Sequence, residues 1–102
     1  MNSTDNGHKS DLLAAWAEAA ALFAAAARNE KAGPAAQLHC LAAATTLGPP
    51  SSPVPATADR ADPDRLIELA LHILGNLPAH DFAHPDILAA AQHGLRALRA
   101  PR

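Results

Sequence analysis

The chain has 102 residues, of which 49% are hydrophobic and 18% are charged, and its formal net charge is −2. This is the length of one domain, and the weakly negative charge without a basic stretch excludes binding driven by phosphate neutralisation, so no nucleic-acid partner is expected. A single cysteine excludes an internal disulfide, and no apolar run reaches the ~20 residues that span a bilayer. The polar N-terminus lacks the pattern of a secretion signal, and we expect a cytoplasmic protein with no membrane partner.

The polar residues 1–9 show no apolar periodicity and are predicted to form a disordered arm before a single helical domain over 10–102. A first helix is predicted from about Asp11 to Lys31, because Ser10 is a favourable N-cap and Asp11 complements the helix dipole. The side expected to face the core carries, at helical spacing, Leu12, Trp16, Ala19, Phe23 and Ala27. The opposite side is mainly alanine.

Xaa-Pro steps mark the remaining helix starts. Three of them each precede an Ala/Leu-rich run, namely Gly33-Pro34, Asp62-Pro63 and His84-Pro85. Proline fits the first turn of a helix and moves the residue before it out of the α region, so each step predicts a start. Helices are therefore expected over about 34–47, 63–74 and 85–100.

Residues 49–61 are rich in proline and serine and are predicted to form an extended linker between a hairpin over 10–48 and a hairpin over 62–100. The predicted fold class is thus an all-α, four-helix domain made of two αα-hairpins. At ~3.1 Å per residue the linker can run the length of a helix, so the helices that flank it need not be antiparallel neighbours. The helix over 63–74 has one narrow polar stripe, and its wide apolar arc predicts a central position in contact with every other helix.

Self-association is favoured by a thin core, because alanine supplies more than half of the apolar residues and buries little area. The helix over 34–47 is apolar on two faces, one with Leu38 and Leu41 and the other with Cys40 and Leu47, and such a helix is usually covered on both. We predict that the alanine side of the first helix and the Cys40 face form the contact surface of a homodimer or of a complex with a protein partner. Its residues are Ala14, Ala17, Ala21, Ala25, Cys40 and Leu47.

Histidines are the first residues to consider for a site. His80 and His84 lie four residues apart, a spacing that places two imidazoles on one side of a helix for zinc or copper. Pro85 disfavours helical geometry at His84, so these two are weak metal candidates, and no metal or cofactor is expected. His39 and Cys40 are adjacent, but neighbours on a helix point ~100° apart and cannot act as a nucleophile and its base.

Recognisable catalytic motifs are absent: the sequence has no phosphate-binding glycine loop, nucleophile elbow, HExxH or paired-cysteine motif. Catalysis therefore has no candidate residue. The expected function is that of a small helical protein-interaction module that associates with itself. Two alternatives stay open: a bundle that binds a small molecule or metal, which an apolar cavity at Trp16 and Phe23 would favour, and a non-catalytic subunit of a biosynthetic enzyme.

Overall fold

A computed structural model describes the backbone of residues 2–48 and 62–100 and the side chains of residues 12–48 and 62–100. This part of the chain is all-α and contains no strand. Its elements are α1 (Asn2–Arg28), the 3₁₀ turn η1 (Glu30–Ala32), α2 (Pro34–Leu47), α3 (Pro63–Gly75), the short α4 (Ala79–Phe82) and α5 (Pro85–Arg99). The predicted linker over 49–61 lies outside the described residues.

The helix starts at the Xaa-Pro steps are confirmed, since α2, α3 and α5 each begin with the proline of one step. Asp62 caps α3, where its side chain accepts a hydrogen bond from the backbone N–H of Asp64 at 3.0 Å. His84 caps α5 in the same way, with Nδ1 accepting from the N–H of Asp86 at 3.1 Å. Gly33, before α2, has φ 85°, a left-handed conformation that glycine adopts without a steric penalty.

The first helix differs from the prediction at both ends. It begins at Asn2, so the structure places residues 2–9 in the helix instead of in a separate arm. These residues start with Asn, Ser, Thr and Asp, which favour a helix N-terminus, and extending an existing helix costs little once it is nucleated. At the other end α1 stops at Arg28 rather than at Lys31, because Asn29 is extended and its side chain accepts a hydrogen bond from the N–H of Lys31 at 3.0 Å.

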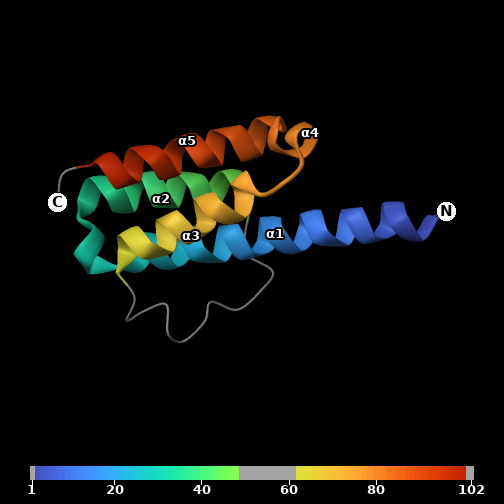
Figure 1. The fold of residues 1–102 in the computed structure, drawn as a ribbon. Coiled ribbons are helices and arrows are strands. Elements are labelled where there is room, and N and C mark those ends of the chain that lie inside the picture. The colour runs from blue at the N-terminus through green and yellow to red at the C-terminus, as the bar shows by residue number, and fades with distance from the viewer. Residues whose placement is uncertain (1, 49–61, 101–102) are drawn as a thin grey trace.

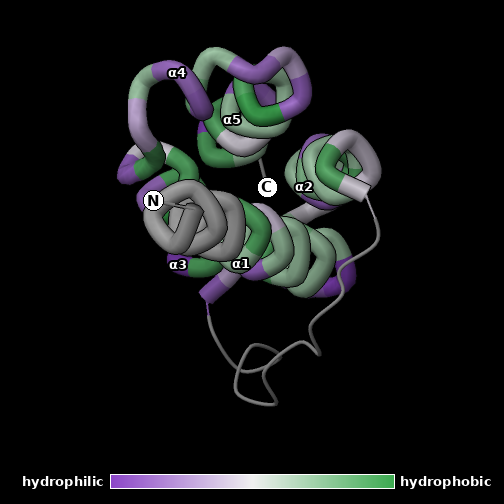
Figure 2. Tube along the Cα trace, turned by 90° about the vertical axis from the view of Figure 1, so that its right-hand side faces the viewer, coloured by the Kyte–Doolittle hydropathy of each residue, from purple (hydrophilic) through white to green (hydrophobic). Residues whose placement is uncertain are grey.

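The long helices form a bundle in which α1 packs against α2 and α3, and α5 packs against the same two helices. Each of these four pairs is antiparallel, whereas α2 and α3 run in the same direction (Figure 1). Viewed along the bundle, the helices surround one core, and α2 and α3 lie on a diagonal (Figure 2). The expected central position of the third helix is therefore wrong: α3 borders α1 and α5, and no helix contacts all the others extensively.

Few large side chains fill this core. Among residues 12–48 and 62–100, the large side chains that are fully buried are Phe23, Ile67, Leu74, Ile87, Pro63 and Cys40, and most of the remaining buried residues are alanines. Phe23 crosses the bundle from α1 to reach α5 and α3. A Cβ atom placed on Gly94 would lie 2.9 Å from Cε1 of Phe23 and 2.9 Å from Cδ2 of Leu71. Phe23 and Leu71 thus fill the space next to Gly94.

Trp16 joins three segments of the chain. Its Nε1–H donates a hydrogen bond to the carbonyl oxygen of Leu47, the last residue of α2, at 2.6 Å. Its ring also meets the ring of His84, with the centroids 5.1 Å apart and an interplanar angle of 81°. The tryptophan therefore holds the end of α2 and the start of α5 against α1.

Candidate functional site

Most of the predicted contact surface lies inside the molecule. Four of its six residues are buried, namely Ala21, Ala25, Cys40 and Leu47, while Ala14 is exposed and Ala17 is half-buried. α1 packs on both α2 and α3, so its covered arc is wider than the single face expected from the sequence. A surface made from this set is therefore not available to a partner in the folded chain.

The two apolar faces of α2 are reversed relative to the prediction. The Cys40 face points inward, with Cys40 fully buried, whereas Leu38 is 66% exposed and Leu41 is 55% exposed. Apart from Leu47 at its end, the inward face consists of small residues, which let α2 approach α1 and α5 closely. The bulkier leucines are consequently left on the outside.

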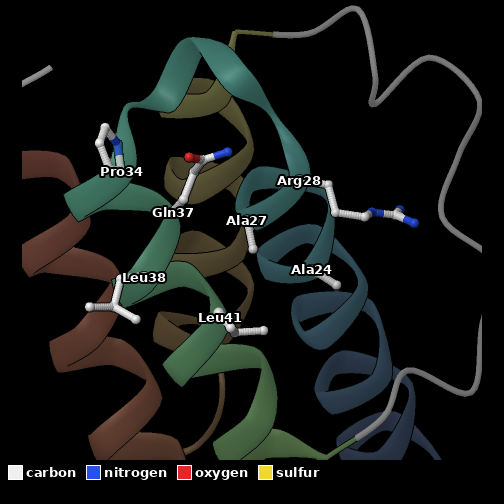
Figure 3. Close-up of a pocket in the computed structure, with 7 residues that line it drawn as sticks. All are labelled: Ala24, Ala27, Arg28, Pro34, Gln37, Leu38 and Leu41. Carbon is white, nitrogen blue, oxygen red and sulfur yellow. The ribbon is translucent and has the colours of Figure 1, made fainter.

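An apolar groove runs along the outside of the bundle between α1 and α2 (Figure 3). Its volume is about 640 Å³. The lining residues are Ala24, Ala27, Arg28, Pro34, Gln37, Leu38 and Leu41. The side chain of Leu41 projects from α2 toward α1, whose two alanines form the opposite wall of the groove (Figure 3). Because alanine side chains are short, the α1 side of the groove leaves room for a partner side chain to enter between the two helices.

Charge is nearly absent from this face. α2 contains no Asp, Glu, Lys or Arg. Arg28 is the one charged residue among those that line the groove, and its side chain extends away from Gln37 and Leu41 (Figure 3). A partner therefore meets a largely apolar surface and needs no charged residue of its own to pair with it.

The two histidines considered for a metal site have separate roles. The side chain of His80 is 75% exposed on α4, with Nε2 3.5 Å from Oδ1 of Asp81. His84 caps α5 and lies against Trp16. Within residues 12–48 and 62–100, no group of three or more His, Cys, Asp or Glu side chains is placed to hold a metal ion.

The thiol of Cys40 is expected to be unreactive in this buried position. Burial, and to a smaller extent the negative charge of Asp64, raise the pKa of its thiol from 9.0 to about 12. The thiolate is the nucleophilic form of cysteine, and it is scarcely populated at neutral pH when the pKa is this high. The buried thiol thus acts as a small apolar side chain in the α2 face that packs inward.

Sequence reasoning missed one pairing of side chains altogether. His39 on α2 and His93 on α5 lie beside one another, with ring centroids 6.2 Å apart. Nothing in the sequence indicates this, because only the antiparallel packing of α2 on α5 brings the two positions together. The exposed pair Leu38 and Leu41, in contrast, is marked in the sequence as one of the two apolar faces of the helix.

Comparisons with protein-family models, with curated proteins and with solved structures give no match. None of the described helices is long and apolar enough to cross a membrane.

Proposed function

We propose that this chain is a protein-interaction module that associates with a second copy of itself through the groove between α1 and α2. The observation that carries the proposal is the exposure of Leu38 and Leu41 on a helix without charged residues. Isolated exposed leucines are common, but these two lie one turn apart beside an apolar groove and form a continuous surface with it.

A second copy is the occupant that fits the charge pattern of this face. In a two-fold symmetric dimer the same patch meets itself, so a charged patch would repel its own copy. Apart from Arg28, whose side chain extends away from Gln37 and Leu41, the residues that line the groove carry no charge, so this apolar part of the face meets its own copy without burying an ion. The alanines also allow the backbones of facing helices to approach closely.

The decisive experiment is sedimentation equilibrium between about 1 and 100 µM protein. We expect a monomer–dimer equilibrium for the wild-type chain, and we expect Leu38→Glu and Leu41→Glu to weaken the dimer by about 30-fold or more, because each dimer would bury two unpaired carboxylates. Both positions are exposed in the single chain, so the helical circular dichroism of the variants should match that of the wild type.

Leu95→Glu supplies the matched control. Leu95 is 47% exposed on α5, so this change adds the same charge at a similar exposure away from the groove. We expect its dimer affinity to be unchanged. A wild-type chain that stays monomeric at 100 µM, or equal weakening by the α2 and α5 variants, would contradict the proposal.

An apolar small molecule is the second candidate occupant, because the groove volume of about 640 Å³ lies within the ~300–1,000 Å³ range of ligand sites. A monomeric wild-type chain that binds one apolar dye molecule, with the binding lost in Leu41→Glu and kept in Leu95→Glu, would favour this candidate over the dimer.

A further inference from the structure

Two half-buried imidazoles meet across the contact between α2 and α5. The rings of His39 and His93 are 6.2 Å apart between centroids, with an interplanar angle of 29°. They belong to antiparallel helices that pack extensively on each other, so the spacing of the two backbones is fixed by the bundle. Neither residue has a part in the groove described above, and both keep some exposure to solvent.

His93 has a polar atom that the described part of the chain leaves without a partner. Its Nδ1 is buried, and no hydrogen bond to it is formed within these residues. A buried polar nitrogen without a partner is uncommon in a native structure and carries a desolvation penalty. In the neutral ring one nitrogen carries a lone pair, which either a hydrogen-bond donor or a metal ion satisfies.

The spacing of the rings matches the size of a metal bridge. A ring nitrogen lies about 1 Å from its ring centre, and metal–imidazole bonds are ~2.0–2.1 Å long, so an ion joining two nitrogens separates the ring centres by about 5 Å at a tetrahedral angle and by about 6 Å when the nitrogens lie on opposite sides of the ion. The observed 6.2 Å lies at the upper end of this range, so the rings must approach by about 1 Å to hold a tetrahedral ion. Because the lone pairs lie in the ring planes and the rings are nearly parallel, binding requires each ring to turn about χ2, a torsion with a broad energy minimum.

We propose that His39 and His93 form a two-histidine site for a divalent first-row transition-metal ion of the zinc and copper class, with water completing its coordination. Imidazole suits these ions, whereas Mg²⁺ prefers oxygen ligands. No third protein ligand accompanies the pair in the described part of the chain. The site is therefore open, unlike a closed structural site with four protein ligands, and the ion acts as a clamp between α2 and α5.

The test is thermal unfolding of the full chain, followed by circular dichroism, with and without zinc in molar excess. An ion that binds the folded state and not the unfolded one raises the melting temperature, and for a chain of this size we expect a shift of about 5 °C or more at saturation. Mg²⁺ at the same concentration should give no shift. Each of His39→Ala and His93→Ala should abolish the zinc response.

His72→Ala and His80→Ala are the matched controls, since both remove an exposed histidine outside the pair. Both should keep the full zinc response. The proposal is overturned if wild-type protein shows no shift, if the shift survives in His39→Ala or His93→Ala, or if it is lost in His80→Ala. Where a pair variant does not fold, zinc titration of the wild-type imidazole NMR signals decides, because those of His39 and His93 must change first and together.

Discussion

The ring of Phe23 on α1 lies against the backbone of Gly94 on α5, close enough that a Cβ atom at position 94 would be 2.9 Å from Cε1 of the ring. Phe23 is fully buried, so a movement of its ring would disturb the side chains packed around it. Gly94 thus leaves the space that the Phe23 ring occupies, although it lies in the interior of a helix, where glycine is ordinarily unfavourable.

We expect Gly94→Ala to lower the free energy of unfolding by about 1 kcal/mol. Helix propensity alone would favour alanine by about 1 kcal/mol, but forcing a methyl group into a filled core typically costs ~1–3 kcal/mol. Gly75→Ala is the control, because nothing lies within 4 Å of the Cβ it would add at the end of α3. Urea melts should show the second variant to be neutral or slightly stabilised. Stabilisation by both changes would mean that Phe23 does not pack on Gly94.

The bond between Trp16 and Leu47 gives a second test. Trp16→Phe keeps an aromatic ring but removes the Nε1–H donor that satisfies the last carbonyl of α2 at 2.6 Å. We expect a loss of about 1 kcal/mol of unfolding free energy, with faster amide exchange at the end of α2.

Thr46→Val removes another hydrogen bond from the same turn of α2, the one from Oγ1 to the carbonyl of Ala42 at 2.8 Å. That bond is local to one helix, where such back-bonding adds little stability, and we expect a change near zero. If Thr46→Val lost as much stability as Trp16→Phe, the hydrogen bond from Trp16 to Leu47 would stabilise the fold no more than a bond within one helix does.

The reversed faces of α2 show how far the sequence predicts this fold. The start and end of the helix at Pro34 and Leu47 are confirmed, because proline geometry and glycine punctuation are local properties. Which apolar face turns inward is not local, since both faces satisfy the same helical period. The choice depends on how closely α1 and α5 approach, and the small face with Cys40 permits the closer packing.

The same limit applies to the sites. Leu38 and Leu41 are visible in the sequence as an apolar stripe, but the expectation that both faces of this helix are covered does not hold for them within the single chain. The pairing of His39 with His93, and the crossing of Phe23 over Gly94, depend on which helices are neighbours. Two αα-hairpins describe the order of the helices along the chain, but they do not specify that α2 packs on α5 and α1 on α3.

Cys40 should make stability depend on alkaline pH. Burial raises the pKa of its thiol from 9.0 to about 12, so above pH 9 the unfolded chain releases a proton that the folded chain still holds. The contribution of the protonated thiol to the free energy of unfolding is fully present below pH 9. It falls as the pH rises from 9 toward 12, by up to about 1.4 kcal/mol per pH unit.

The measurement is the difference in unfolding free energy between wild type and Cys40→Ala, which cancels the titration of other groups. We expect this difference to be constant between pH 7 and 8.5 and to shift in favour of the alanine variant at pH 10 and above. Parallel stability curves through pH 10.5 would show that the thiol ionises equally in the folded and unfolded states.

Two isoleucines of α3 test the rotation of this helix about its axis. Ile67 is fully buried, whereas Ile73 is partly buried at the edge of the core. Ile67→Ala should cost about 2–5 kcal/mol, since the bundle cannot close the cavity that it leaves, and Ile73→Ala, which removes the same atoms, should cost clearly less. His72→Ala, on the exposed stripe, should change stability by less than about 0.5 kcal/mol. Denaturant melts that rank Ile73→Ala as the most damaging of the three would show that α3 is turned differently, and that its contact with α1 is not the one described.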